Sequence, residues 1–174
     1  NRQFLLSEIV SLATVDVLNR YATGFSIKWP NDIYWHDKKI AGILIENVLS
    51  GSTFSRAIIG MGLNINQKNF YSDAPNPVSL HQITGHTYKI EKILDEFTEA
   101  LGKRYTDTFT NSSDRIHKEY IAALYRNDGV YPFYSDGNIF HASIADVELD
   151  GHLLLLTESG EKKRFAFKEV SFLL

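Results

Sequence analysis

The chain of 174 residues carries 18 basic and 21 acidic side chains, a formal net charge of −3 and no cysteine. This charge balance argues against a dedicated nucleic-acid-binding surface, and the lack of cysteine excludes disulfides, thiol nucleophiles and thiolate metal sites. With 44% apolar and 22% charged residues and no apolar run of about 18 residues, we expect a globular cytoplasmic protein without a membrane-spanning helix.

The first third of the chain predicts one helix followed by antiparallel strands. Residues 2–21 place apolar side chains at helical spacing and contain neither Gly nor Pro. The run from Ile40 to Ile45 is apolar without alternation, so we expect both of its faces to be buried. Short turns between sequential strands favour antiparallel pairing, and the predicted strands are Phe25–Trp29, Ile33–Trp35, Ile40–Val48 and Phe54–Ile65.

The middle of the chain predicts a long loop and then helices. Asn66–Pro77 is polar and rich in Pro, and loops of this length in compact domains are often functional. Ser79 is expected to cap a short helical turn that ends at Gly85. Two amphipathic helices follow at Ile90–Phe109 and Ser113–Tyr125. Their predicted inward faces are Ile93, Leu94, Phe97, Leu101 and Tyr105 in the first, and Ile116, Tyr120, Ile121 and Leu124 in the second.

The pattern changes after Asn127 to short apolar segments separated by hairpin dipeptides. These dipeptides, of which Asp-Gly is a strong two-residue hairpin signal, are Asp136-Gly137, Asp150-Gly151 and Ser159-Gly160. We therefore expect residues 128–174 to form a small β-barrel of four or five strands. Residues 1–127 are expected to form an α+β layer, with helices on one face of a mixed, largely antiparallel sheet.

The stretch Lys28–Glu46, KWPNDIYWHDKKIAGILIE, crowds charged and amide groups onto a short hairpin with apolar flanks. Lys39 stands at a turn-to-strand junction, where its ammonium could pair with an anion partly out of water. The alternative is a solvated turn lysine, the commoner situation for this residue type. Ala41 and Gly42 are either close-packing residues or leave room for a ligand to lie against the strand.

Asn31 and Asp32 follow Pro30, which gives their backbone a rigid lead-in. They are either ordinary turn residues or an amide and a carboxylate aimed at phosphate, at Mg²⁺ or at an incoming amine. Lys28, on the preceding strand, could neutralise phosphate charge. Trp29 is expected in the core.

The segment GMGLNIN places Asn64 and Asn66 on one face of a predicted strand. A dinucleotide-binding fingerprint is excluded here because Ile65 stands at the third glycine position and no helix follows. Asn64 is therefore either a ligand-facing amide or a strand-end cap. The six histidines show no ligand spacing, so we expect no structural zinc site.

The segment Lys28–Asp32, followed by Lys39–Gly42 and by the strand that carries Asn64, closely resembles the signature of biotin–protein ligases. The resemblance extends to the tail, where Phe140–Leu156 and Gly160–Glu169 are similar to the small SH3-like C-terminal domain of that family. It implies a catalytic domain of the biotin/lipoyl ligase fold, related to the catalytic domains of class II aminoacyl-tRNA synthetases, followed by an SH3-like barrel.

The resemblance also implies an activity. Such ligases use ATP and Mg²⁺ to form biotinyl-5'-AMP and then transfer biotin to a lysine of a biotin carrier protein, such as the acetyl-CoA carboxylase subunit. Catalytic roles would fall to Lys39 and Asp32. Binding of biotin or the adenylate would fall to Lys28, Asn31, Lys39, Ala41, Gly42 and Asn64. The alternatives are a lipoate or octanoate ligase, which the Lys28–Asp32 motif disfavours, and a non-catalytic binding module of the same fold.

Nothing before Lys28 resembles the glycine- and arginine-rich loop that covers the adenylate in that family. We therefore expect the chain to be the C-terminal part of such a ligase, able to fold but inactive alone, because adenylyl transfer depends on electrostatic stabilisation. An open sheet edge would favour a homodimer. Neither a nucleic-acid nor a membrane partner is expected.

Overall fold

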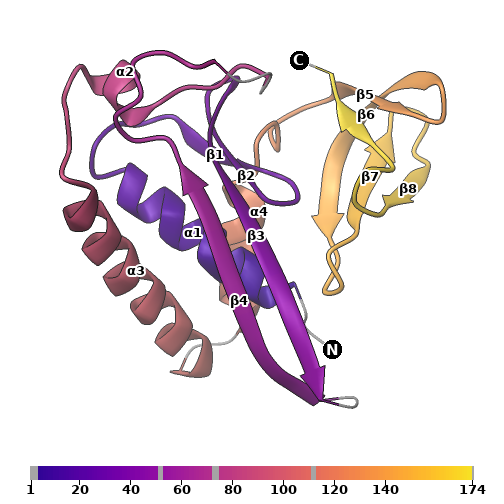
Figure 1. The fold of residues 1–174 in the computed structure, drawn as a ribbon. Helices are drawn as coiled ribbons and strands as arrows, with labels where there is room; N and C mark the ends of the chain where they lie inside the picture. The colour runs from indigo at the N-terminus through magenta and orange to yellow at the C-terminus, as the bar shows by residue number, and fades with distance from the viewer. Residues whose placement is uncertain (1–3, 51–52, 72–74, 111–112, 174) are drawn as a thin grey trace.

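Two antiparallel sheets and four helices make up the computed structural model, which describes residues 4–50, 53–71, 75–110 and 113–173 (Figure 1). The helices are α1 (Leu5–Leu18), α2 (Leu80–Thr84), α3 (Ile90–Thr110) and α4 (Ser113–Ala122). The strands are β1 (Phe25–Lys28), β2 (Asp32–Trp35), β3 (Lys38–Ser50), β4 (Thr53–Leu63), β5 (Tyr131–Ser135), β6 (Asn138–Val147), β7 (Leu153–Thr157), β8 (Lys162–Phe165) and β9 (Ser171–Phe172).

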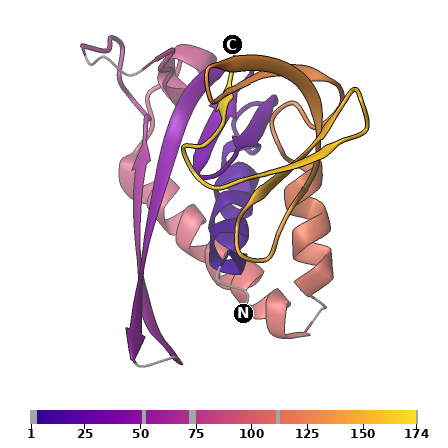
Figure 2. The same ribbon diagram turned by 90° about the vertical axis from the view of Figure 1, so that its right-hand side faces the viewer.

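The first sheet has the spatial order β1-β2-β3-β4, with every neighbouring pair antiparallel. Helices α1, α3 and α4 lie on one side of it, and the β3–β4 hairpin extends well past β1 and β2 (Figures 1 and 2). The helix-facing row of Ile27, Ile33 and Ala41 is fully buried. The segment after α4 covers the outer edge of β1 through two backbone hydrogen bonds to Ile27, and β4 forms the other edge. The predicted α+β class with antiparallel pairing is confirmed.

One burial prediction for this sheet is wrong. Leu44 is 62% exposed, although the run from Ile40 to Ile45 was expected to be buried on both faces. At this point β3 has passed the end of β2, and the side chain of Leu44 lies on the face opposite the helices, where its partner across the ladder is Gly60. No element covers the side chain there, in the part of the chain that the structure describes.

Helix α3 packs along a narrower line than predicted. Leu94 and Tyr105 are 58% and 52% exposed, so their assignment to the inward face is wrong. The predicted inward positions Ile93, Phe97 and Leu101 are confirmed, since Ile93 is buried and Phe97 and Leu101 are half-buried against the core. Ala100 and Arg104, on the same side of the helix, are buried and half-buried. The predicted inward face of α4 is confirmed for Ile116 and Tyr120, with Ile121 half-buried. The helix ends at Ala122, earlier than the predicted Tyr125, and Leu124 is buried in the segment that follows.

Between β4 and α2 the chain forms the predicted long loop, of which residues 72–74 lie outside the described part. The loop returns to the first sheet, where the Lys39 amide donates to the Asn76 carbonyl over 2.9 Å. Ser79 caps α2 as predicted, since its side chain accepts a hydrogen bond from the Gln82 amide in a capping box. Gly85 closes the helix with a φ of 76°, a conformation that favours glycine.

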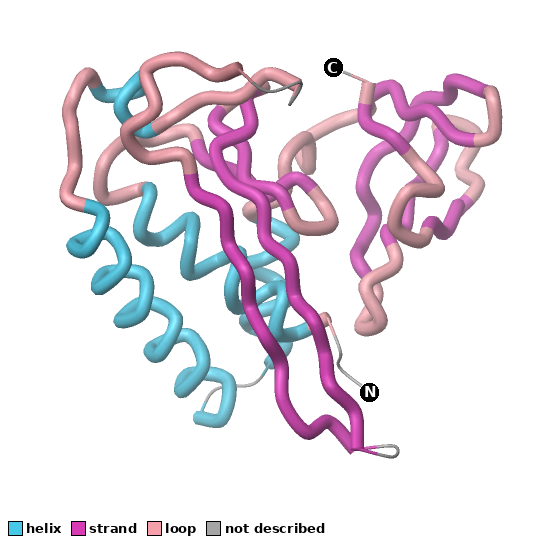
Figure 3. The backbone as a smooth tube through the Cα atoms, viewed as in Figure 1, coloured by secondary structure: helices cyan, strands magenta, loops and turns pink. Residues whose placement is uncertain are grey.

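The second sheet has the order β8-β7-β6-β5-β9, with β8 and β9 at its edges. This part of the chain consists of strands and loops (Figure 3). The three predicted dipeptide turns all fall between its strands, and Gly137, Gly151 and Gly160 adopt positive φ. No helix occurs between residues 138 and 168. Among the described residues, no helix has the length and apolar character needed to cross a lipid bilayer.

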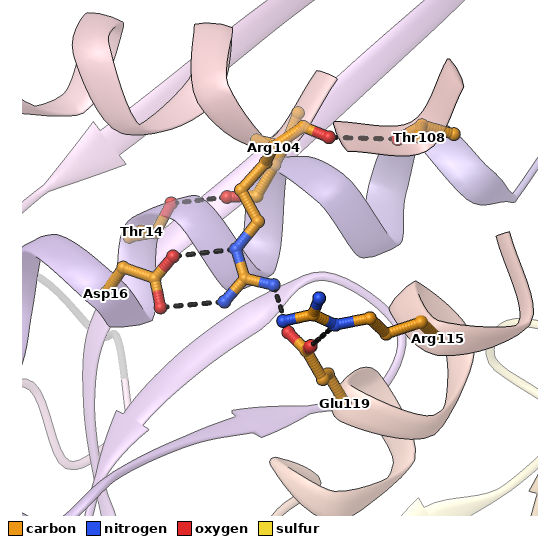
Figure 4. A network of polar contacts seen from close by, with 7 residues as sticks. Thr14, Asp16, Arg104, Thr108, Arg115 and Glu119 are labelled. Atoms are coloured by element: carbon orange, nitrogen blue, oxygen red, sulfur yellow. Dashed lines mark hydrogen bonds and ion pairs between the residues drawn. The ribbon is translucent and has the colours of Figure 1, made fainter. Parts of the chain in front are cut away.

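Three of the helices are tied together by Arg104, which lies on α3 (Figure 4). Its Nε and Nη2 donate to both carboxylate oxygens of Asp16 on α1 over 2.7 and 2.8 Å, and its Nη1 donates to Glu119 on α4. Arg115 donates to the other oxygen of Glu119 over 2.8 Å. The hydrogen bonds to Asp16 raise the pKa of Arg104 despite its burial. The network thus fixes how the three helices pack.

Replacing Arg104 by glutamine is expected to lower the free energy of unfolding by about 2 kcal/mol. The Arg104 side chain is only 17% exposed and binds two carboxylates. The stability lost with it should therefore lie between the loss for a surface ion pair and the loss for a buried one. Arg115, 65% exposed on the same Glu119, is the matched control, and Arg115→Gln should cost less than about 0.5 kcal/mol. Urea denaturation of both variants measures the difference. Equal losses would show that Arg104 is an ordinary surface residue.

Candidate functional site

A single row of residues crosses all four strands of the first sheet on the face opposite the helices. Lys28 on β1 pairs with Asp32 on β2, Asp32 pairs with Gly42 on β3, and Gly42 pairs with Gly62 on β4. Directly opposite residues of an antiparallel ladder share a face, so two charged side chains stand beside two positions without side chains. We call this row the sheet floor.

Lys39 reaches the sheet floor because of a β-bulge. Tyr34 pairs with Lys39 but Ile33 pairs with Ala41, so Ile40 is an extra residue on β3. In regular alternation Lys39 would lie on the opposite face from Gly42, three residues later; the bulge reverses this. The Lys39 Nζ therefore lies above Gly42 and forms an ion pair of 2.6 Å with Asp32 Oδ1.

The glycines keep the floor bare. A Cβ placed on Gly42 would lie 3.3 Å from Lys39 Nζ and 3.4 Å from Asp32 Oδ1. A Cβ on Gly62 would meet nothing within 4 Å, and one on Gly60 would meet only the Leu44 carbonyl at 3.8 Å. Beside the ion pair there is thus a flat patch of backbone on which a planar or extended ligand has room to lie.

Lys28 is held among aromatic rings at one end of the floor. Its Nζ donates to the Tyr34 hydroxyl over 2.9 Å and lies 4.6 Å from the Tyr34 ring centroid and 5.5 Å from that of Phe172 on β9. Burial lowers the pKa of Lys28; the charge of Asp32 opposes this shift, whereas Arg126 and Lys39 add to it. Burial, together with the Asp32 charge, raises the pKa of Tyr34 to about 12.

Arg126 brings a third cation into this neighbourhood from the segment between α4 and β5. Its guanidinium lies 5.0 Å from the ring centroids of both Tyr125 and Tyr131, and its Nη1 donates to the Leu173 carbonyl over 2.5 Å. Lys28 and Lys39 therefore share the single carboxylate of Asp32, and the charge of Arg126 adds to the positive field at Lys28. Such a surplus of positive charge suits an anionic ligand.

The other predicted site residues are placed differently. Asn31 holds the β1–β2 turn to β3, because its Nδ2 donates to the Ile43 carbonyl over 2.7 Å and its own carbonyl accepts from the Ile43 amide. It also lines a cavity of about 300 Å³ together with Trp29 and Phe167. Trp29 is buried as predicted. The side chain of Ala41 faces the helices and is 2% exposed, so it does not line the floor.

The predicted strand face shared by Asn64 and Asn66 is wrong. β4 ends at Leu63, after which the Asn64 amide donates to the Ile40 carbonyl and the Asn64 carbonyl accepts from the Leu80 amide. Asn66 instead binds both backbone polar groups of Tyr88 through its side chain. Contacts with residues 80–88 therefore draw the chain out of the sheet. Asn64 still lies beside Ile40, next to Lys39.

Sequence reasoning missed Tyr34, Arg126 and Phe172. Tyr34 follows Asp32 by two residues, so the two-residue period of a strand was a usable signal for it. Arg126 and Phe172 come from segments far along the chain, and no spacing in the sequence connects them with Lys28.

Metal ligands are scarce at the floor. Within the described residues, the acidic and histidine groups close enough to share an ion are Glu148, Asp150 and His152, which lie on and next to the β6–β7 turn. Arg164 already binds Glu148 over 2.5 Å and Asp150 over 2.6 Å. Arg164 thus already occupies both carboxylates of this cluster. At the floor itself, the described residues offer a metal ion only the carboxylate of Asp32.

Comparison with known proteins connects these features to one group. Residues 2–64 match the family described as Biotin/lipoate A/B protein ligase. Over 148 residues the chain is 29% identical to the bifunctional ligase/repressor BirA of Bacillus spizizenii. This alignment covers 80% of this chain and 44% of that protein. Over 128 residues it is 30% identical to the biotin–[acetyl-CoA-carboxylase] ligase of Paracoccus denitrificans, covering 70% of this chain and 53% of that protein. The chain thus spans about half the length of these relatives.

A solved structure agrees over almost the whole chain. The biotin protein ligase from Aquifex aeolicus in complex with biotin and ATP superposes with a TM-score of 0.76, covering 98% of this chain and 72% of that one. The sequence identity is 22%, so this agreement concerns the fold, with its antiparallel sheets and helices.

Proposed function

Because this chain belongs to the biotin/lipoate A/B protein ligase family, we propose that it carries the adenylate end of a biotin–protein ligase site. The reaction would form biotinyl-5'-AMP from biotin and ATP and then transfer biotin to a lysine of a carrier protein. The observation that carries this proposal is the Lys39–Asp32 ion pair held above the bare backbone of Gly42. It puts a fixed ammonium beside a surface on which an acyl-adenylate has room to lie.

In the first step a carboxylate oxygen of biotin bonds to the α-phosphorus of ATP, and the bond to the β-phosphate oxygen breaks to release pyrophosphate. Negative charge builds up on the α-phosphate oxygens in the transition state. The Lys39 ammonium, already oriented by Asp32, is proposed to offset this charge, which is the type of stabilisation that preorganised cations supply. Lys28 and Arg126 would neutralise the remaining phosphates from the aromatic end of the floor.

In the second step the neutral amine of the carrier lysine attacks the carbonyl of the mixed anhydride, and AMP leaves. Holding the adenylate against the sheet next to the amine supplies rate through proximity. Asp32 is proposed to keep Lys39 on the leaving phosphate. Asn31, through its bonds to β3, would fix the wall of the cavity of about 300 Å³ that it lines with Trp29.

Mg²⁺ would add charge neutralisation on the phosphates when ATP binds. The donor set fits an ion bound mainly through the nucleotide, since Asp32 is the only carboxylate of the floor and is paired with Lys39. Mg²⁺ is commonly held by one or two carboxylates plus phosphates and water.

We propose that residues 1–127 form the catalytic domain, of the class II aminoacyl-tRNA synthetase type, and residues 128–174 the small SH3-like barrel. The separate five-stranded second sheet with its tight turns supports this division.

The acceptor would be a biotin carrier domain. A homodimer through β4 is proposed because β4 is an edge strand and Ile58 on it is 55% exposed. The expectation of a cytoplasmic protein stays a prediction.

Ligand-induced stabilisation tests the proposed function. Thermal unfolding is followed with biotin plus MgATP, with lipoate plus MgATP, with octanoate plus MgATP and with MgATP alone. A ligand at 100 times its Kd stabilises the folded state by about 2.7 kcal/mol. Selective stabilisation by biotin plus MgATP, with biotin-dependent pyrophosphate exchange in the full-length natural protein, supports a biotin ligase. Stabilisation by lipoate or octanoate would assign the site to the other branch, and no response to any mixture would contradict both.

Gly42→Ala is expected to slow biotin-dependent pyrophosphate exchange about tenfold, a loss that corresponds to about 1.4 kcal/mol in the barrier. The added methyl group would press on Lys39 Nζ at 3.3 Å and displace the ion pair by a few tenths of an ångström. Gly102→Ala, in exposed helix α3 where a Cβ meets nothing within 4 Å, is the control and should leave the rate unchanged. An unchanged rate in Gly42→Ala would show that the floor tolerates a side chain.

A further inference from the structure

A histidine joins three elements that the proposed reaction does not use together. The Nδ1 of His117 on α4 lies 2.7 Å from Glu8 Oε1 on α1, and its Nε2 lies 2.8 Å from Asp146 Oδ1 on β6. One imidazole thus bridges two carboxylates, one from the helical layer and one from the second sheet. The three residues are here called the His117 bridge.

The number of these hydrogen bonds that His117 can donate depends on its protonation state. A neutral imidazole has a single N–H and can donate to only one carboxylate, whereas the imidazolium donates to both. Burial acts to lower the pKa of His117, but the hydrogen bonds to Glu8 and Asp146 outweigh it, so that the pKa is raised. The Tyr120 hydroxyl on α4 also lies in the field of Glu8, and burial followed by the Glu8 charge raises its pKa, so it stays neutral.

The two carboxylates differ in their access to water. The side chain of Glu8 is 5% exposed and that of Asp146 is 48% exposed. Taking one hydrogen-bond donor away from a buried carboxylate costs more free energy than taking it away from an exposed carboxylate, which replaces the donor with water. When His117 loses a proton, the remaining N–H therefore stays with Glu8. The bond to Asp146 is the one that breaks.

Asp146 lies close to where the second sheet meets the first part of the chain. The Phe4 amide donates to the Leu149 carbonyl over 3.3 Å, and Trp29 Nε1 donates to the Gly151 carbonyl over 2.9 Å. Leu149 and Gly151 belong to the turn that follows β6, and Gly151 lines the cavity of about 300 Å³ beside Asn31. A change at Asp146 therefore bears on the wall of that cavity.

We propose that the His117 bridge is a proton-controlled latch that fastens the second sheet to the helical layer. Because the pKa of folded His117 is raised, the stability of this contact is fully present below the ordinary value of 6.5 and is lost as the pH rises through the raised value. At high pH the β6–β7 turn is held to the rest of the chain by fewer hydrogen bonds, and the cavity wall loosens.

The test follows Trp29, whose indole is bonded to this turn. In a Trp35→Phe background Trp29 is the sole tryptophan, and its emission is recorded from pH 5.5 to 9 alongside an NMR titration of the His117 ring. Both midpoints are expected to agree and to lie above 6.5. His117→Gln should abolish the emission transition. His141→Gln is the control, at an exposed position on β6, the strand that carries Asp146, and should retain the transition.

Asp146→Asn provides a second variant that spares the buried Glu8–His117 bond, in case His117→Gln does not fold. It is expected to lower the midpoint of His117 and to flatten the Trp29 response. A His117 midpoint at or below 6.5, or a Trp29 transition that persists in Asp146→Asn, would overturn the latch. A bridge that only supports the fold would lower the melting temperature of the variants equally at every pH.

Discussion

Lys39→Ala in the full-length natural protein is expected to slow biotinyl-adenylate formation by about 10³-fold or more while the protein stays folded. Removal of a single preorganised group that stabilises transition-state charge costs about 10²–10³-fold. The loss in Lys39→Ala should reach or exceed the upper end of this range, because Lys39 bears a full charge. Its Nζ lies 2.6 Å from Asp32 Oδ1, which holds it above Gly42.

The effect on stability should be small. The Lys39 side chain is one-third exposed, and partly exposed ion pairs contribute at most about 1 kcal/mol. Lys38→Ala is the matched control, since Lys38 is the exposed neighbour in the same hairpin and should leave the rate unchanged. Biotin-dependent exchange of pyrophosphate into ATP gives the rate, and urea denaturation gives the stability. Exchange within tenfold of the unmodified protein would return Lys39 to the role of a solvated turn lysine.

How Lys39 reaches this position shows where sequence reasoning stops. The pattern of Lys39, Ala41 and Gly42 marks the strand correctly, but simple alternation would put Lys39 and Gly42 on opposite faces. The extra residue Ile40 reverses this, and no composition signal announces a bulge within an apolar run. The residue types of the site were therefore predictable, whereas the face on which each residue lies was not.

The same limit applies to the helices. Their existence and approximate ends followed from apolar spacing, because a 3.6-residue period is a local property. Which part of the apolar stripe on α3 is buried depends on the packing of α1 against it, and so Leu94 and Tyr105 proved exposed. The contacts of Phe172 and Arg126 with the surroundings of Lys28 join segments far apart in the sequence, and only the folded chain brings them together.

Asp32→Asn should lower the rate of adenylate formation about 10²-fold, a smaller loss than that of Lys39→Ala. Asparagine keeps the shape of the side chain and can still accept one hydrogen bond from Lys39, but it removes the charge that orients the ammonium. Asp32 is 24% exposed and lies at the start of β2, so the stability should fall by no more than about 1 kcal/mol.

A double variant decides how Asp32 acts. If Asp32 works by positioning Lys39, then Asp32→Asn combined with Lys39→Ala should be no slower than Lys39→Ala alone, because residues that act as a unit are not additive. Asp95→Asn, at an exposed position of α3 away from the floor, controls for the loss of one negative charge and should remain active. Losses that multiply in the double variant would give Asp32 an independent role towards phosphate, Mg²⁺ or the incoming amine. Unfolding of Asp32→Asn would instead identify Asp32 as a structural turn residue.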